Sequence, residues 1–567
     1  MTYSFNLLDE KWIPCLHVGG QPDLVNLREA IFEAPNILEV SHPSPLVTIS
    51  LHRLMLAVLH RNCGPREGPG GPADTAEWGR LWEKKAWDKE RLDQYFEKWK
   101  ESFDLFHEKY PFYQTLEIPF EKYETTAGLL SLSPPYRSHP TLFDHGLVDV
   151  PPSLSPAEAA LLLVAQQAFA YVNLVTYENK EHKSAKAASL VRSAVVLNRG
   201  SNLFETLMLN LHAYNPDDEE PFHFDPKTDK PAWERSEYTR PSDRLPDGYL
   251  DWLTWQSRRV RLKPTVGKDG KVTVCNIVIM KGFQLPKGKW RRDYETMIPF
   301  RANKTAKKEE EPWPPVQFEE DKSLWRDSLS LLQSIRDSRD RPRTVDWIAD
   351  LKMTGALPKS LKVRLAVFGL SADQSKPEFW RREELPLDVR FYDNEELVAA
   401  LSNALRLAER SGDTIAARVK VKVKRKRGAP LEKWLWGLGY VLMLPEEPAE
   451  ISEEQEKGIK NLEKNVAPSR AFWPHLETPF KRLLEDLPDD TSTDENGSAV
   501  YGAQRLPEWA ATVRRAAQQA FDMTSAAVGE SARALKARAK AESVFRRRLN
   551  SILKPDNKQK KEGGEEA

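Results

Sequence analysis

The most polarised stretch of the chain carries seven cations within ten residues, from Arg418 to Arg427. Lysine and arginine at this density can contact a nucleic-acid backbone, because each phosphate that they neutralise releases bound counterions. A solvated helix end or hairpin explains the same charge pattern, and both interpretations stay open. The candidate contacts to a DNA backbone are Lys420, Lys422, Lys424, Arg425 and Arg427.

A second cluster mixes aromatic and cationic side chains. Arg258, Arg259 and Arg261 follow closely on Trp252 and Trp255. Nucleic-acid surfaces combine these residue types, because bases stack on aromatic rings and phosphates attract cations. Protein interfaces and the edges of cores use the same combination. We favour the structural or interface interpretation for this cluster.

Side chains that perform enzymatic chemistry do not form a recognisable motif. The sequence has no HExxH, GxxxxGK[ST], GxGxxG or GxSxG pattern. His52 and His60 lie in an apolar segment, where a histidine is more often structural than a metal ligand. The acidic clusters Glu309–Glu311 and Asp489–Asp490 have the residue type that binds Mg²⁺, but their polar neighbours favour solvated charge. We therefore predict no catalytic residues, no metal site and no cofactor.

Length and composition bound the class of protein. A chain of 567 residues exceeds the roughly 250–300 residues at which single cores stop growing, so at least two domains are expected. Lysine plus arginine and aspartate plus glutamate both number 84, so any attraction to nucleic acid must come from local clusters. Three cysteines without a CxxC pair argue against a disulfide framework and a cysteine-rich zinc site.

The N-terminus and the hydropathy predict a cytoplasmic protein. The first residues, MTYSFNLLDEKWIP, lack the basic start and the long apolar run of a secretory signal. No stretch approaches the roughly 20 apolar residues that a membrane helix needs. We expect a reducing cytosol and no membrane partner.

Residues 1–386 alternate helical and β-rich patterns, which predicts an α+β domain. A helix is expected to begin at Ser155, because an N-cap serine, a first-turn proline and a capping-box glutamate occur there in order. β-Branched residues predict strands at Val272–Met280 and Val363–Leu370. The Lys/Glu/Pro-rich segment Lys304–Pro315 is expected to be a linker.

Residues 387–555 are rich in helix-forming Ala, Leu, Glu, Lys and Arg, which predicts an all-α bundle. An apolar stripe from Pro507 to Leu553 defines one helical region of this bundle. The stripe comprises Val513, Ala516, Ala517, Ala520, Phe521, Thr524, Val528, Leu535, Ala539 and Leu549. Its expected partners are Asn394–Arg410, Leu431–Leu444 and Ser469–Leu487. We expect a loop at Pro488–Gly502 and a disordered tail at 556–567.

A run of small side chains at Lys183, Ser184, Ala185 and Lys186 carries two cations. Small side chains allow a backbone to approach a groove or a phosphate closely, and lysine supplies the charge. By itself, this run is typical of an ordinary loop.

Several phrases of the sequence, taken in order, resemble one family. They are Asn6–Pro14, Pro111–Thr115, Asn202–Leu211, Leu253–Leu262 and Phe368–Gln374. Together they resemble CasA proteins, the large subunits of type I-E CRISPR Cascade complexes. The resemblance covers roughly Phe5 to Glu384 and implies that the C-terminal bundle has four helices.

The resemblance also implies three parts that probe DNA beside the target. Gln374, with Asp373 before it, falls where the family places a glutamine wedge. Lys281 is our choice for the lysine finger, with Lys287 and Lys289 as alternatives. The family's glycine-rich loop is replaced by Lys183, Ser184, Ala185 and Lys186, which include no glycine, so its motif preference is in doubt. Phe143 falls in the family's loop that meets the guide RNA, and a core phenylalanine is the alternative.

The function implied is recognition of the protospacer-adjacent motif in duplex DNA, opening of the duplex and recruitment of a helicase-nuclease. The implied partners are a guide RNA, double-stranded target DNA, the other Cascade subunits and the helicase-nuclease. Two alternatives stay open: a scaffold subunit of a ribonucleoprotein that does not read DNA, and a metal-dependent nuclease.

Overall fold

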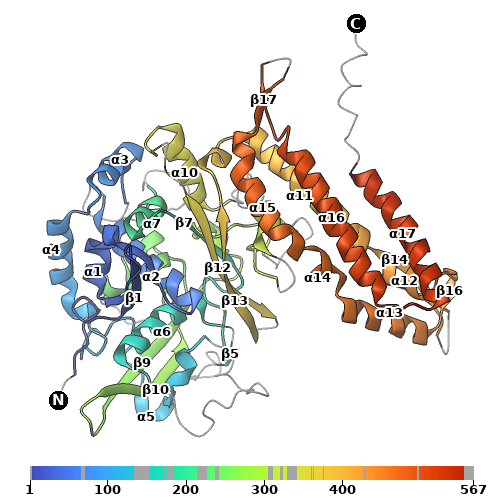
Figure 1. Cartoon of the computed structure of the whole chain (residues 1–567). Helices are drawn as coiled ribbons and strands as arrows, with labels where there is room; N and C mark the ends of the chain where they lie inside the picture. The colour runs from blue at the N-terminus through green and yellow to red at the C-terminus, as the bar shows by residue number, and fades with distance from the viewer. Residues whose placement is uncertain are drawn as a thin grey trace. The chain divides into compact units, whose positions relative to one another are not determined.

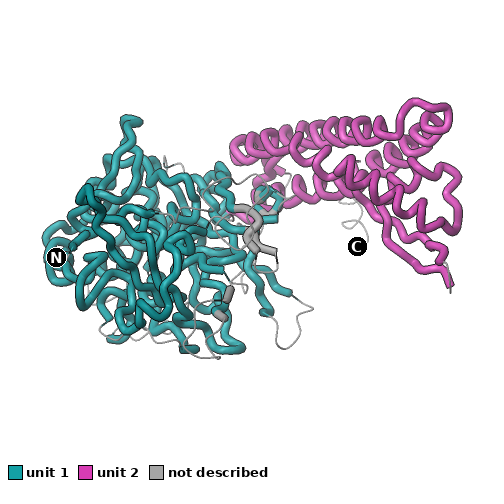
Figure 2. The backbone as a smooth tube through the Cα atoms, turned by 90° about the horizontal axis from the view of Figure 1, so that it is seen from below, with its two compact units in different colours: residues 1–393 teal, residues 394–567 magenta. Residues whose placement is uncertain are grey.

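The chain divides into two units, residues 1–393 (unit 1) and residues 394–567 (unit 2) (Figure 2). The structure is a computed structural model. It describes residues 3–64, 71–132, 153–171, 173–174, 184–213, 227–235, 242–303, 311–319, 323–328, 341–358, 361, 363–373, 376–425, 429–494 and 497–553. The sequence places the domain boundary slightly earlier, between residues 386 and 387.

The core of unit 1 is built around two apolar helices that pack against each other, α2 (Pro45–Asn62) and α6 (Pro156–Phe169). Nearly every side chain of α2 is buried. The predicted start of α6 is confirmed, since Ser155 and Glu158 form a reciprocal capping box that satisfies two backbone N–H groups. Both helices are therefore fixed parts of the framework.

Two three-stranded sheets of unit 1 carry Lys281 and the segment that leads to Gln374, two positions singled out from the sequence. One has the order β4-β10-β9 and the other the order β13-β12-β7. The strands predicted at Val272–Met280 and Val363–Leu370 are confirmed as β10 and β12. In Figure 1, β12 and β13 run side by side over most of their length. The strand bounds are Thr125–Thr126 (β4), Ala194–Arg199 (β7), Arg258–Val266 (β9), Val272–Lys281 (β10), Arg364–Asp373 (β12) and Lys376–Pro386 (β13).

Shorter elements complete unit 1. Its third sheet, of order β2-β1-β3, consists of β1 (Ile13–His17), β2 (Pro22–Val25) and β3 (Ile37–Val40). The helices are α1 (Leu27–Phe32), α3 (Thr75–Lys84), α4 (Lys89–Trp99), α5 (Phe120–Tyr123), α7 (Leu203–Asn210), α8 (Tyr249–Leu253) and α10 (Arg343–Met353). Besides β4, the described two-residue strands of unit 1 are β5 (Asn173–Leu174), β6 (Ser184–Ala185), β8 (Ser242–Asp243) and β11 (Phe283–Gln284).

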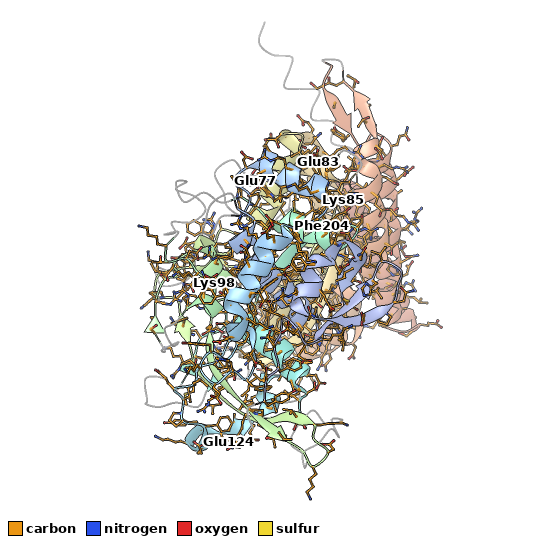
Figure 3. All side chains as sticks on the ribbon, turned by 90° about the vertical axis from the view of Figure 1, so that its left-hand side faces the viewer. Glu77, Glu83, Lys85, Lys98, Glu124 and Phe204 are labelled. Carbon is orange, nitrogen blue, oxygen red and sulfur yellow. The ribbon has the colours of Figure 1, made fainter. Side chains whose placement is uncertain are left out.

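Aromatic side chains hold the outer helices of unit 1 in place. Phe204 of α7 lies with its ring centroid 6.4 Å from that of Trp82 on α3 and 4.8 Å from that of Trp87. Figure 3 shows Phe204 near α3. These contacts join α3 to α7, which itself packs against β7.

Helices α11, α15 and α16 of unit 2 run side by side (Figure 1). Trp509 of α16 donates its indole N–H to the carbonyl of Ala404 on α11, and Phe521 of α16 stacks on Phe545 of α17. The helices are α11 (Glu395–Ala416), α12 (Gly437–Met443), α13 (Glu453–Val466), α14 (Pro468–Phe472), α15 (Pro474–Asp486), α16 (Arg505–Ala526) and α17 (Ala532–Ile552).

The prediction that this unit is all-α is wrong. A sheet of order β15-β14-β16 and a β17–β18 hairpin lie among the helices. Leu431–Leu444 was predicted to be one helix but contains β15 followed by α12, and the predicted loop Pro488–Gly502 contains the hairpin. The strands are β14 (Arg418–Val423), β15 (Leu431–Trp436), β16 (Glu450–Ile451), β17 (Thr491–Thr493) and β18 (Ala499–Tyr501).

The predicted apolar stripe is correct in α16 and shifted in α17. Its residues from Val513 to Thr524 are buried, and so is Leu549 of α17, as predicted. Val528 is half-buried, Leu535 and Ala539 are exposed, and α17 buries Ala534, Ala537, Ala541 and Phe545 in their place. Gly529, with φ of +82°, follows α16 and lets the chain turn before α17 begins in a new phase. The tail 556–567 lies outside the described residues. Within the described part of the chain, no helix has the length and apolar character of a membrane span.

Candidate nucleic-acid interface

Two of the predicted DNA-binding lysines meet at one carboxylate of unit 1. Lys281 ends β10, and its Nζ lies 3.6 Å from Oδ1 of Asp243. Lys186 follows β6, and its Nζ lies 3.9 Å from Oδ2 of the same aspartate. The Lys281 side chain is only 17% exposed, whereas that of Lys186 is 59% exposed. The structure thus brings together two residues that are far apart in the sequence.

Lys186 is held in place through three of its own polar groups. Its backbone N–H donates to Oε1 of Gln284 over 2.7 Å, and its Nζ donates to the carbonyl of Leu285 over 2.8 Å. The third contact comes from Arg258, whose Nη2 donates to the Lys186 carbonyl over 3.0 Å. The segment that we predict to take the place of the family's glycine-rich loop is therefore anchored at Lys186.

The buried side chain of Arg258 links several backbone segments of unit 1 by hydrogen bonds. It also donates to the carbonyls of Tyr171, over 2.6 Å, and of Ser257, over 2.8 Å. Arg258 and Arg259 are both buried, as are Trp252 and Trp255. The structural interpretation of this Trp/Arg cluster is confirmed.

A close crossing of the backbone positions the chain beyond Lys281. A Cβ on Gly282 would lie 2.3 Å from the carbonyl oxygen of Gln256, so only glycine fits at this position. The following strand, β11, pairs in parallel with β8, and this register sets Gln284 opposite Asp243. Sequence reasoning missed both Asp243 and Gln284, because strands of two residues carry no periodic signal.

A groove of about 430 Å³ adjoins these lysines. Its lining combines cations with aromatic rings, the residue types that bind phosphates and stack on bases. Lys287 and Lys289, the alternative finger residues, lie on its rim and are exposed. Its cations are Lys186, Lys287, Lys289 and Arg291. Phe283 and Trp290 are its half-buried rings, whereas Trp252 and Trp255 are buried in its wall and are not available for stacking.

Two arginines stabilise the walls of this groove. Arg244 lies 3.9 Å from the ring centroid of Phe283 and 4.5 Å from that of Trp255. Arg291 donates to the carbonyl of Val191 over 2.8 Å and faces Glu311 at 3.5 Å. Burial raises the pKa of the Glu311 carboxyl, an effect that the positive charge of Arg291 opposes. The groove is a preformed surface with partly neutralised positive charge.

The remaining predicted residues of unit 1 are placed only in part. Gln374, Lys183 and Phe143 lie outside the described residues. The strands on either side of Gln374 pair as far as Asp373 and Lys376. Ser184 and Ala185 form β6, and Ala185 is buried.

The basic stretch of unit 2 forms β14 and the residues directly after it. Lys420 and Lys422 are exposed on β14, and Lys424 and Arg425 are exposed beyond its end. Arg427 lies outside the described residues. This observation favours the hairpin interpretation over the helix end.

Two of the side chains considered as metal ligands have structural partners, and Glu309 and Glu310 lie outside the described residues. His52 faces the carbonyl of Thr48 through Nδ1 at 2.8 Å, and burial lowers the pKa of its imidazole to about 4. Asp490 accepts the backbone N–H groups of Gln504 and Arg505 at the start of α16. Across the described part of the chain, no group of three or more His, Cys, Asp or Glu residues has the arrangement of a metal site.

Comparison with known proteins identifies the class of this chain. The family model described as CRISPR-associated protein Cse1 matches residues 6–520, which places the chain among the CRISPR-associated proteins. Within that class, the chain belongs to the Cse1 (CasA) family, and the resemblance seen in the sequence is confirmed.

Individual relatives agree with this assignment. CasA/Cse1 of Thermus thermophilus is 30% identical over 97% of this chain and 98% of its own length. A crystal structure of CasA from Thermus thermophilus matches with a TM-score of 0.74 and 26% identity, over 97% of this chain and all of that one. A chain from a structure described as a CRISPR RNA-guided surveillance complex matches with a TM-score of 0.66 over 97% of this chain and 99% of its own. At 19% identity, that last match shows a shared fold.

Proposed function

We propose that this chain is a non-catalytic subunit of an RNA-guided surveillance complex and recognises the protospacer-adjacent motif in duplex DNA. It then helps to open the duplex and recruits a helicase-nuclease. Membership of the Cse1 family supports the assembly with a guide RNA and other Cascade subunits. The observation that carries the DNA-reading role is the convergence of Lys186 and Lys281 on Asp243, beside a groove lined with cations and aromatic rings.

Lys281 is the residue that we assign to the minor groove. The acceptor atoms on the floor of that groove and its negative potential attract a lysine ammonium group. Because the Lys281 side chain is 17% exposed and faces Asp243, it must exchange this carboxylate for DNA acceptors. Asp243 would thus pair with Lys281 in the free chain and release it when DNA binds.

Lys186 would contact the backbone of the same duplex. Its three anchoring hydrogen bonds fix the position of the segment, and its ammonium group is largely exposed. A phosphate contact from a fixed segment sets the register of a protein on DNA without reading the sequence. Lys183, Ser184 and Ala185 complete the segment that takes the place of the glycine-rich loop.

Gln374, with Asp373 beside it, would act as the wedge that separates the first base pairs. A planar amide can stack on an exposed base and offer it hydrogen bonds, and unstacking a step costs a few kcal/mol. Phe143 is assigned to stacking on the guide RNA, as bases of single-stranded RNA stack on aromatic side chains. Cleavage would then be performed by the recruited helicase-nuclease.

The decisive experiment compares duplexes that differ only in the bases beside the target. Complex assembled with the natural chain is expected to discriminate among them, and complex with Lys281→Ala is expected to lose most of that discrimination. Lys271→Ala is the matched control, because Lys271 is exposed and directly precedes β10, at the end opposite Lys281. Lys287→Ala and Lys289→Ala test the alternative finger residues, and a loss of discrimination in one of them but not in Lys281→Ala would assign the finger to that residue. A complex that binds all duplexes equally would be a scaffold that does not read DNA. Cleavage by the chain alone with Mg²⁺ or Mn²⁺ would instead indicate a nuclease.

A further inference from the structure

The hairpin formed by β14 and β15 in unit 2 has one buried and one open face. Val421, Val423 and Leu435 point into a core with residues of α12, β16 and α13. Because side chains alternate along a strand, Lys420 and Lys422 point to the opposite face. They are exposed, so this second face is open to solvent within unit 2.

Trp434 lies on this open face, directly opposite Lys420. The register of β14 and β15 pairs these two residues, which sets their side chains next to each other. The Trp434 side chain is 60% exposed, the largest exposed fraction of any described tryptophan. The exposed indole offers a flat aromatic face on which a base can stack.

This face carries more cations than acidic groups: Arg418, Lys420, Lys422, Lys424 and Arg425 stand against Glu432, Glu463 and Glu450, which lies opposite Lys422 on β16. Lys420 forms an ion pair with Glu432 at 2.6 Å, and Arg418, at the start of the row, forms one with Glu463 at 2.6 Å. The side chains of Arg418, Lys420 and Glu432 are at least half exposed, and only that of Glu463 is less so. A phosphate can therefore compete with these weak ion pairs. The row continues with the exposed cations Lys422, Lys424 and Arg425.

We propose that this face of the β14–β15 hairpin binds single-stranded nucleic acid. Lys420, Lys422 and Lys424 contact successive phosphates, and one base stacks on the indole of Trp434. A single strand is favoured over a duplex, because only unpaired bases expose a π-face to an aromatic side chain on a protein surface. The proposal does not depend on the proposed function, since it concerns unit 2 and needs no motif recognition.

The experiment measures binding of the purified full chain to fluorescent strands of about 20 nucleotides, long enough to cover one binding site, by anisotropy. Three ligands are compared: oligo-dT, oligo-rU and a DNA duplex of the same length. Trp434→Ala is expected to weaken single-strand binding about 5- to 150-fold, as expected from about 1–3 kcal/mol per stacked base. Trp434→Phe keeps a stacking ring and is expected to restore most of the affinity.

The lysines are tested by charge reversal with a charge-matched control. Log affinity falls with log salt, and each phosphate contact on a single strand contributes about 0.7 to the slope of this fall. The double variant Lys422→Glu, Lys424→Glu loses two contacts and is expected to make the fall shallower by about 1.4. The control, Lys457→Glu with Lys464→Glu, changes exposed residues of α13 by the same net charge and is expected to leave the slope nearly unchanged.

The outcomes separate this proposal from its competitors. Preference for oligo-dT over oligo-rU, or the reverse, identifies DNA or RNA as the natural strand, and both results support the proposal. The proposal would be overturned if Trp434→Ala left single-strand binding intact, or if the duplex bound as strongly as the single strands. Either result would show that the face attracts phosphates by charge alone. Absence of single-strand binding at low salt would also overturn the proposal and would leave a protein partner as the occupant. None of these results depends on whether the assembled complex distinguishes target motifs.

Discussion

Arg258 donates a hydrogen bond from Nη2 to the backbone carbonyl of Lys186 over 3.0 Å, although the two residues are 72 positions apart in the sequence. The same guanidinium also binds the carbonyls of Tyr171 and Ser257. One buried side chain therefore connects the start of β9 to the segment that we assign to DNA. Arg258 is a positioning residue, because Lys186 and not Arg258 would contact the DNA.

The first prediction concerns this connection. Arg258→Met is expected to lower the free energy of unfolding by at least about 1–3 kcal/mol, the cost of one buried carbonyl left without a donor, because the Arg258 side chain donates to three carbonyls. Complex that contains this variant should also bind duplex targets more weakly at a temperature where the chain is folded. Denaturant unfolding and duplex binding are the two measurements. Arg261→Met is the control, because Arg261 donates instead to Ile118, away from Lys186; an equal loss of binding in this control would contradict the positioning role.

The second prediction concerns Asp243. Asp243→Asn removes the negative charge that Lys186 and Lys281 share, so duplex binding should become about two- to fivefold tighter at low salt, as expected for partly exposed ion pairs. The gain should fade at high salt because of screening. The control is Asp269→Asn, which makes the same change of net charge at an exposed pair with Lys271. Equal gains in the two variants would show a general charge effect and exclude a specific role for Asp243.

The local parts of the fold could be predicted because their signals lie within a few neighbouring residues. The capping pattern at Ser155 fixes the start of α6, and the β-branched run of β10 is one continuous strand. The meeting of Lys186 with Lys281 could not be predicted, since it depends on the two-residue strands β8 and β11 and on the buried contact from Arg258. No periodicity marks such short strands.

The error in unit 2 has a different cause. The segment Arg418–Val423 alternates cations and valines with a period of two, which is the pattern of a half-buried strand. The helix-forming composition of the surrounding sequence outweighed this signal in our sequence interpretation. The role of Gln374 as a wedge is predicted only from its place in the family's order of motifs. This role stays a prediction.

The third prediction is a dependence of stability on pH. Burial lowers the pKa of His52 to about 4 in the folded chain, while the unfolded chain keeps the ordinary value of 6.5. Between these two values the unfolded state binds more protons, so the stability present above pH 6.5 is lost as the pH falls towards 4. His212, whose pKa burial lowers to about 3, acts in the same direction. Asp229 acts in the opposite direction, because burial raises its pKa to about 7.

Variants isolate the contribution of His52 from these other groups. The difference in free energy of unfolding between about pH 7.5 and about pH 5, which bracket the ordinary histidine pKa, is measured for the natural chain, His52→Gln and His107→Gln. The difference in stability between the two pH values should be smaller in His52→Gln than in the natural chain. This holds even if the substitution itself changes the stability at the higher pH. His107→Gln replaces a partly exposed histidine and controls for the loss of an imidazole elsewhere in the chain. An undiminished difference in His52→Gln would contradict the prediction.

The fourth prediction concerns a buried ion pair in the core of unit 1. Nη1 of Arg53 lies 2.9 Å from Oε1 of Glu295, and the indole N–H of Trp252 donates to the other carboxylate oxygen. Arg53→Met leaves the buried Glu295 charge without its partner and should cost about 3–5 kcal/mol. The double variant Arg53→Met, Glu295→Gln should recover part of this loss, as measured by denaturant unfolding. A double variant that is as unstable as the sum of the two single variants would show that the pair is not coupled.

The fifth prediction tests duplex opening by Gln374. If its amide replaces the stacking that the first base pair loses, Gln374→Ala removes a contribution of a few kcal/mol only when the duplex must be opened. Complex with this variant should bind duplex targets more weakly and bind targets with pre-melted pairs beside the motif normally. Gln284→Ala is an informative comparison, because Gln284 accepts the backbone N–H of Lys186 and its loss should disturb binding to both kinds of target. A Gln374→Ala complex that loses equal affinity for both targets would show that Gln374 acts as a contact and does not separate base pairs.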